Sequence, residues 1–183
     1  MVALNSYSTP KEGVSAEVVY VKDVQKLKKM DVKGKIVFAE TSPSRIYNDA
    51  IVNGGAIGLM TYDSPSYLQP EKNTTSIQFR SIPLNSKLKP WAIALSYHAK
   101  ERLKEALLKG PITLHVQIET KIYESEELTI VADIKGNKLP NERLVFSAHV
   151  QEPGANDNAT GVGVALEMAT LSDRKSTRLN SSH

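Results

Sequence analysis

Short apolar runs bounded by turn residues organise the first two thirds of the chain. Runs of this kind, rich in β-branched and small apolar residues, predict strands. They cover residues 16–21, 34–39, 56–61, 77–82, 91–96 and 112–122. Helical patterns lie between them at 24–30, 45–52 and 97–109, and a Pro-, Ser- and Asn-rich stretch at 64–75 predicts a loop. The pattern indicates an α/β fold.

The last third of the chain has its own pattern. Apolar residues at 143–148 predict a buried strand, and the small-residue run 159–170 predicts a helix. His149 and Asp157 lie between this strand and the helix. Open α/β sheets place their ligand sites at the carboxyl ends of strands, so these two side chains are expected to converge there. The sequence therefore predicts a metal site at this junction.

The segment Gly154–Gly161, with the sequence GANDNATG, carries a family resemblance. It resembles the zinc aminopeptidases with two co-catalytic metals, a family that also contains glutamate-carboxypeptidase-like and transferrin-receptor-like members. The resemblance implies two zinc ions, with His149 binding one ion and Asp157 bridging both. An imidazole suits zinc, and a carboxylate has two oxygens with which to span two ions. The resemblance also implies that Asn158 helps to hold the ligands in position without itself binding zinc, and that the Asp157–Asn158 peptide bond is cis.

One position departs from the family pattern. Gln151 stands two residues after His149, where the family has aspartate. Its amide can still accept a hydrogen bond from the imidazole but brings no charge, so zinc affinity is expected to fall by roughly 10–100-fold. The family's Glu-Glu pair, further acidic ligand and last histidine are expected downstream of this chain. Glu126-Glu127 does not take the Glu-Glu role, because it comes before Asp157, at the start of the segment 127–136 that resembles the family's preceding strand; it is interpreted as solvated charge. No catalytic residue is therefore predicted here, and the general base is expected downstream as well.

Residues 16–122 resemble a second family, the protease-associated domain, a small β-rich module with flanking helices. The resemblance is carried by segments in a characteristic order. They are Val32-Lys-Gly-Lys-Ile-Val37, the Gly54-Gly55-Ala56-Ile-Gly58 core, the Ile82-Pro83 turn and the run Trp91-Ala-Ile-Ala-Leu-Ser96 before a helix. The expected fold class is thus a β-rich protease-associated-like α/β domain, followed by the first strands and helix of a zinc-peptidase α/β sheet.

The last eleven residues, 173–183, indicate a different origin from the rest. They match the one-frame translation of a widely used short-read sequencing adapter, and we interpret them as an artefact. His183 is therefore not counted as a ligand. The expected domains are a protease-associated-like domain at 1–121, the N-terminal part of a zinc-peptidase catalytic domain at 122–172, and this tail.

The amino-acid composition limits the kinds of partner and site that this chain is expected to have. The chain has 23 basic and 20 acidic residues, or 20 and 19 without the tail, so no nucleic-acid partner is indicated. The Lys- and Glu-rich stretch 100–109 indicates a solvated helix face. No apolar run approaches the ~20 residues that span a bilayer, so no membrane span is expected. The absence of cysteine excludes thiolate ligands, cysteine nucleophiles and disulfides.

Two functions remain open at this stage. The first is a zinc-dependent exopeptidase, an amino- or carboxypeptidase, that hydrolyses peptide or protein substrates through a two-metal site. For this enzyme the resemblance implies a periplasmic or secreted location. The second is a non-catalytic relative that binds proteins or peptides, an alternative favoured by Gln151.

Overall fold

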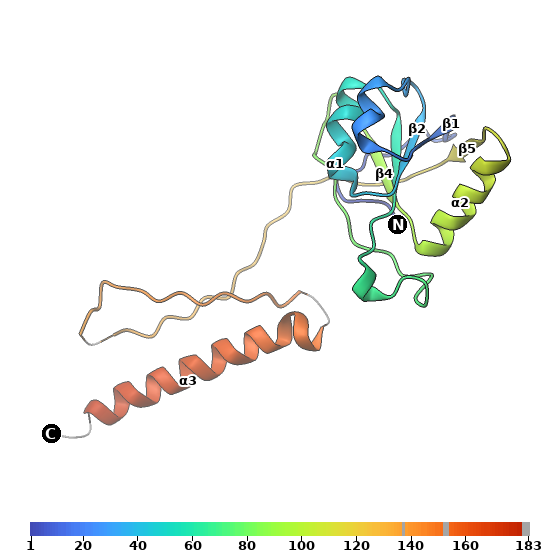
Figure 1. Ribbon diagram of the computed structural model, residues 1–183. Coiled ribbons are helices and arrows are strands. Elements are labelled where there is room, and N and C mark those ends of the chain that lie inside the picture. Colours follow the sequence, from blue (N-terminus) through green and yellow to red (C-terminus); the bar gives the residue numbers. More distant parts are fainter. Residues whose placement is uncertain (137, 152–153, 181–183) are drawn as a thin grey trace. The chain divides into compact units, whose positions relative to one another are not determined.

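The computed structural model describes residues 1–136, 138–151 and 154–180, with side chains described as far as residue 173. The chain divides into two compact units, Met1–Glu124 and Ser125–His183. The first unit contains all the strands among the described residues. The second consists of an extended irregular segment followed by a long helix (Figure 1).

The first unit is built on a five-stranded sheet with the strand order β4-β3-β2-β1-β5. Strands β1 to β4 run parallel to their neighbours, and β5 pairs antiparallel with β1. The strand bounds are β1 Val14–Val21, β2 Ile36–Ala39, β3 Gly58–Thr61, β4 Trp91–Ala94 and β5 Thr113–Val116. The strands predicted at 16–21, 34–39, 56–61 and 91–96 are therefore confirmed, and so is the α/β class of this unit.

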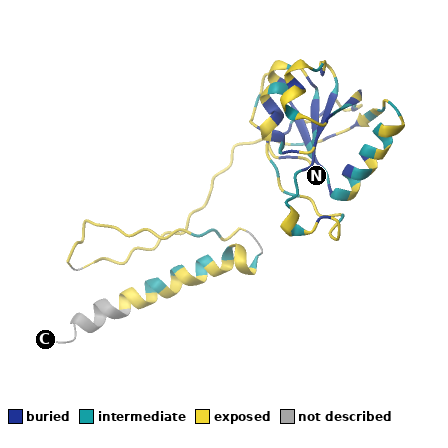
Figure 2. Cartoon of the chain, in the orientation of Figure 1, coloured by how far each residue is buried: buried dark blue, intermediate teal, exposed yellow. Residues whose placement is uncertain are grey.

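Both faces of the sheet are covered. In the central strand β2, Val37 and Ala39 belong to one apolar cluster, while Ile36 and Phe38 belong to another. All four side chains are fully buried, and Figure 2 shows buried residues concentrated in the central strands of the sheet. Successive side chains of a strand point to opposite faces, so a strand buried on both faces must be apolar throughout. This explains why the run contains no polar residue.

Helical elements cover these two faces (Figure 1). One face packs against three short elements, which are η1 (Val24–Lys29), α1 (Pro43–Tyr47) and η2 (Asn48–Asn53). The other face packs against α2 (Tyr97–Lys109) through Leu103 and Leu107. The bounds of α2 agree with the predicted helix, because the Ser96 hydroxyl accepts a hydrogen bond from the backbone N–H of Ala99 at 3.2 Å and Gly110 follows the last turn.

Two predicted strands of the first unit differ from the structure. The run 77–82 forms only an isolated bridge, Leu4↔Ser81, because the N-terminal segment that pairs with it also bridges Ile93 and cannot form a continuous ladder with either. The strand predicted over 112–122 stops at Val116, since its pairing with β1 ends at the first residue of that strand, Val14. Between β3 and β4 the chain is irregular except for the single turn η3 (Ser66–Leu68).

In the second unit, the strands predicted over 127–136 and 143–148 are wrong for the structure. Neither segment has a strand assigned in its described residues, and the apolar side chains face solvent (Figure 2). Leu128 is 90% exposed and Leu144 is 83% exposed. A strand needs a hydrogen-bonded neighbour, and no described residue pairs with either segment. The expected first strands of a zinc-peptidase sheet are therefore not formed.

The predicted helix of the second unit is present and longer than expected. The turn η4 (Ala155–Ala159) leads into α3 (Thr160–Asn180), whereas the prediction ended at residue 170. No glycine or proline occurs between residues 164 and 180 to stop the helix. Helix α3 thus includes part of the tail at 173–183, whose interpretation as an artefact stays a prediction. Within the described part of the chain, no helix has the length and apolar character that crossing a membrane requires.

Candidate metal-binding site

Two glycines shape the junction between the irregular segment and α3. A Cβ atom on Gly154 would lie 2.1 Å from the backbone oxygen of Asp157, and one on Gly161 would lie 2.0 Å from Oδ1 of Asn158. Both distances are too short for any side chain. Within the turn, the N–H of Ala159 donates to the Gly154 carbonyl at 3.2 Å. Glycine is therefore needed at both positions, because the turn is tight and brings the backbone oxygen of Asp157 and the side chain of Asn158 close to them.

The turn brings the two predicted metal ligands together. Nε2 of His149 lies 3.1 Å from Oδ1 of Asp157, with the imidazole 41% exposed and the carboxylate 76% exposed. The two residues are separated by seven positions in the sequence, so the contact depends on the turn. The Asp157–Asn158 peptide bond is cis, as the family resemblance of this segment implied.

The other ring nitrogen of His149 is unusual. Nδ1 is buried and has no hydrogen-bond partner among the described residues. Gln151, the residue predicted to accept from this nitrogen, is exposed and does not pair with it. Buried polar atoms without a partner are rare in proteins, so each one calls for an explanation. At a metal site, an N–H at this position would be the donor that orients the ring.

Asn158 has a defined role at the start of α3. Its Oδ1 accepts a hydrogen bond from the backbone N–H of Gly161 at 3.1 Å. This contact satisfies one of the free N–H groups of the first helical turn, as a helix-capping side chain does. Asn158 therefore fixes the direction in which α3 leaves the turn, and with it the position of the neighbouring Asp157.

The donor types of this pair suit zinc, but their number is small. Zinc takes imidazole nitrogen and carboxylate oxygen and is usually four-coordinate. No group of three or more His, Cys, Asp or Glu side chains able to hold a metal occurs in the described residues. His149 and Asp157 thus fit as part of a zinc site, and the orphaned Nδ1 of His149 agrees with a ring that is used through Nε2.

A cavity of about 330 Å³ lies beside the pair. It is an open hollow between the end of the irregular segment and the first two turns of α3, and most of its wall is apolar. The lining residues are Phe146, Ser147, Asn158, Thr160, Gly161, Val164 and Ala165. Asn158 therefore contributes both to this cavity and to the turn that carries Asp157.

A second polar cluster lies in the first unit, at the carboxyl ends of β2 and β3. The side chain of Lys100 is 7% exposed, so the prediction of a solvated helix face is wrong at this position. Its Nζ lies 4.1 Å from the ring centroid of Tyr97 and 4.6 Å from that of Tyr62. It also lies 2.5 Å from Oε1 of Glu101 and 3.6 Å from Oε2 of Glu40. Lys100 is buried because it lies on the face of α2 that packs against the sheet.

The charges of this cluster compensate one another. Burial alone would raise the pKa of the Glu40 carboxyl, but hydrogen bonds from Tyr20 and Lys104 outweigh it and hold that pKa below its ordinary value. Burial would lower the pKa of Lys100, but its bond to Glu101 and the nearby carboxylates raise it instead. Two lysines thus face two glutamates, which is an arrangement that stabilises the fold. The sequence signal for it was the helical position of Lys100, three residues before Leu103 on the apolar face.

Comparison with known proteins gives a match in the second unit. Residues 129–182 match the model of Peptidase family M28, a region that includes His149, Asp157 and most of the tail. No curated protein matches the chain. The region that carries the candidate site is therefore similar to an M28 peptidase.

Two solved structures are similar to the chain. An aminopeptidase from Aneurinibacillus sp. strain AM-1 is 22% identical over 60% of this chain and 26% of its own, with a TM-score of 0.43. A Peptidase M28 precursor from Shewanella amazonensis SB2B is 16% identical over 63% of this chain and 32% of its own, with a TM-score of 0.38. The chain thus spans about a quarter to a third of the length of these proteins.

Proposed function

We propose that this chain is part of a zinc-dependent exopeptidase that hydrolyses peptide bonds, as an aminopeptidase. The observation that carries the proposal is the 3.1 Å approach of His149 Nε2 to Asp157 Oδ1. This approach occurs in the region that is similar to Peptidase family M28. Peptides or proteins would be the substrates, and the proposed location is periplasmic or extracellular.

The residues present would hold zinc in a defined way. His149 would contribute Nε2 to one ion, and the two oxygens of Asp157 would be shared between two ions. When bound, zinc would polarise the scissile carbonyl and lower the pKa of a bound water. Gly161 and Asn158 would keep the carboxylate in place through the bond between them, at 3.1 Å. The task of these residues is thus to bind and to orient.

The remaining parts of the site would come from polypeptide outside the described residues. A general base and three further ligands are needed, because two ions with three protein ligands each require six bonds and His149 and Asp157 would supply three of them. We therefore expect residues 1–183 alone to bind zinc weakly and to hydrolyse no peptide. Measurable peptidase activity of this chain would contradict that expectation.

Zinc titration of the chain, measured by isothermal titration calorimetry, tests the proposed ligands without requiring enzymatic activity. We expect Asp157→Ala and His149→Ala each to weaken zinc binding by about tenfold or more, since each removes one of two donors. Asp133→Ala is the matched control, because it removes an exposed carboxylate from the same unit. Equal zinc affinity in the Asp157→Ala and Asp133→Ala variants would exclude Asp157 as a ligand.

A second candidate function is a non-catalytic module that binds proteins or peptides. It is favoured by Gln151, which stands where an acidic partner for His149 is expected. The Gln151→Asp variant separates the two candidates. A gain in zinc affinity of about tenfold or more favours a weakened metal site, whereas unchanged affinity together with no zinc binding by the native chain favours the binding module.

A further inference from the structure

The carboxyl end of the first unit is held by the amino-terminal segment of the chain. The N–H of Thr9 donates to the Ile118 carbonyl at 3.0 Å, and the N–H of Ile118 donates to Oγ1 of Thr9 at 2.9 Å. The N–H of Thr120 donates to Oγ of Ser8 at 2.8 Å, and Oγ1 of Thr120 donates to the Ser6 carbonyl at 2.9 Å. We call these contacts the Thr120 clamp. They hold the chain in the first unit as far as Thr120.

The seven residues that follow, 121–127, have no such support, and we call them the linker. All of them are exposed, and none is in a helix or strand. None makes a hydrogen bond or an ion pair with any residue that the structure describes. Nζ of Lys121 lies 5.8 Å from the ring centroid of Tyr123, a contact within the linker itself. The division between the two compact units falls inside the linker, between Glu124 and Ser125.

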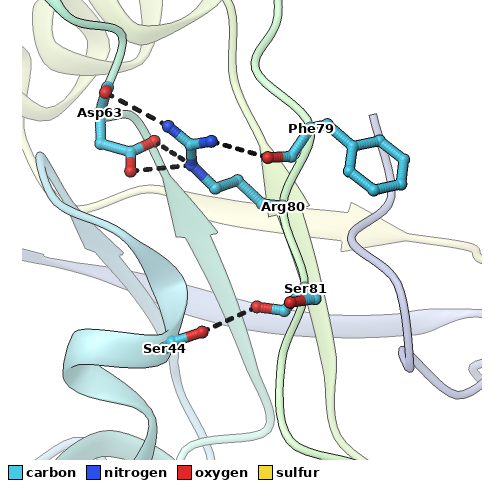
Figure 3. A network of polar contacts seen from close by, with 5 residues as sticks. All are labelled: Ser44, Asp63, Phe79, Arg80 and Ser81. Carbon is cyan, nitrogen blue, oxygen red and sulfur yellow. Dashed lines mark hydrogen bonds and ion pairs between the residues drawn. The ribbon is translucent and has the colours of Figure 1, made fainter. Parts of the chain in front are cut away.

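The irregular segment between β3 and β4 also has exposed residues, but side chains tie it down (Figure 3). Nε of Arg80 donates to both carboxylate oxygens of Asp63, at 2.7 and 2.8 Å. The Ser44 hydroxyl donates to the Ser81 carbonyl at 2.9 Å. These bonds cross-link the segment and attach it to α1. Local unfolding of this segment must break them, whereas the linker has no comparable bonds to break.

The free backbone of the linker suits it to an endopeptidase. Such enzymes bind residues on both sides of the scissile bond in an extended conformation, through backbone hydrogen bonds, and they cut preferentially at exposed, unpaired segments. The bond after Lys121 is shielded, because the residues immediately before it belong to the Thr120 clamp. The bond after Glu124 has residues 121–123 free before it and residues 125–127 free after it. The accessible part of the linker is therefore its second half.

Acidic side chains are concentrated in this accessible part. Glu124, Glu126 and Glu127 are three of the seven linker residues, and all three are exposed. None of them forms an ion pair within the ranges that the structure describes. An endopeptidase whose specificity pocket is cationic would select these carboxylates by charge complementarity.

Two exposed glutamates elsewhere in irregular chain are less accessible, because each lies in a hydrogen-bonded turn. Around Glu71, the N–H of Asn73 donates to the Gln69 carbonyl at 2.9 Å. The N–H of Glu142 itself donates to the Leu139 carbonyl at 3.1 Å. A turn must open before its backbone can extend along an enzyme, so these two positions should be cut later than the linker.

We propose that the linker is a processing site for an endopeptidase that cuts after glutamate. The hydroxyl of a water molecule adds to the carbonyl carbon of the glutamate, the C–N bond breaks, and the remaining hydrogen of the water goes to the departing nitrogen. Cleavage releases the first unit with the Thr120 clamp intact and leaves His149 and Asp157 together on the second fragment. The reaction requires no zinc, so its outcome is independent of the candidate metal site.

Digestion of the full chain by a glutamyl endopeptidase tests the proposal. Mass spectrometry of a time course identifies the first product, which is expected to end at Glu124, Glu126 or Glu127. Fluorescence of Trp91, which is buried in the first unit, should keep its native spectrum after cleavage. A variant that combines Glu124→Gln, Glu126→Gln and Glu127→Gln should release the first unit at least about tenfold more slowly, because the selected carboxylates are gone.

Matched controls and contrary outcomes complete the test. Glu71→Gln and Glu142→Gln each remove an exposed glutamate that lies in a turn, and they should leave the rate of release unchanged. A first cut after Glu71 or Glu142, or equal release from the native chain and the triple variant, overturns the proposal. So does resistance of the native linker under conditions that cut a synthetic peptide of residues 118–130. Loss of the native Trp91 spectrum on cleavage also overturns it, because the first unit would then not be released in folded form.

Discussion

Nζ of Lys100 lies 3.6 Å from Oε2 of Glu40, which joins α2 to the residue that follows β2. The contact crosses from the helix to the sheet beside the rings of Tyr62 and Tyr97. Lys104 reaches the other oxygen of Glu40 at 2.9 Å. Glu40 is thus the shared partner of two lysines from one helix, and its charge helps to hold α2 on the sheet.

The variant Glu40→Gln removes this shared charge. We expect the free energy of unfolding at pH 7 to fall by about 1 kcal/mol, a modest value because the carboxylate is partly exposed. The native contribution is present above the ordinary pKa of 4.5 and is lost as pH falls through the lowered pKa of the folded state. Urea denaturation of both proteins should therefore show a difference at pH 7 that narrows at pH 3. A difference that stays constant would contradict the role of the Glu40 charge.

The first unit has a packed core, whereas the segment 125–151 does not, and two leucine substitutions compare them. Leu59→Ala removes a fully buried side chain of β3 and should cost about 2–5 kcal/mol of unfolding free energy. Leu128→Ala changes a side chain that is 90% exposed, and its effect should stay within about 0.5 kcal/mol. Thermal unfolding monitored by Trp91 fluorescence and by circular dichroism measures both. A large cost for Leu128→Ala would mean that this segment packs against a partner in solution.

Gly161 and Gly163 provide a matched pair for the turn that carries Asp157. A Cβ on Gly161 would meet Asn158, so Gly161→Ala should displace Asn158 and weaken zinc binding by the chain. A Cβ on Gly163 meets nothing within 4 Å, so Gly163→Ala should leave zinc binding unchanged and raise helix stability by about 1 kcal/mol. Zinc titration and circular dichroism distinguish these effects. Equal zinc affinity of both variants would show that zinc binding does not depend on the geometry of this turn.

The pairing of Arg80 with Asp63 makes the conservative variant Arg80→Lys informative. Lysine keeps the charge but cannot reproduce the contacts of the guanidinium group with Asp63 and Phe79. We expect a loss of about 1–2 kcal/mol in unfolding free energy and faster proteolysis within residues 64–90. Arg45→Lys, at an exposed position of α1, is the control. Unchanged proteolysis of Arg80→Lys would show that the loop is held by other contacts.

The sequence by itself determined much of the local structure. Apolar runs bounded by glycine and proline predicted the five strands, and the helical pattern at 97–109 predicted the bounds of α2, because these signals act over a few residues. The GANDNATG segment located the junction at which His149 and Asp157 meet. A turn of this kind is specified locally, since its glycines are needed for contacts within eight residues.

Only the tertiary structure decided which surfaces are buried. Lys100 lies in a Lys- and Glu-rich stretch but is buried, because helix α2 turns the face that Lys100 shares with Leu103 toward the sheet. The runs at 127–136 and 143–148 have the composition of strands but face solvent, because a strand forms only beside another strand. Residues 4 and 81 come together through a bridge between distant segments. Such pairings depend on contacts between residues far apart in the chain, which local sequence patterns do not specify.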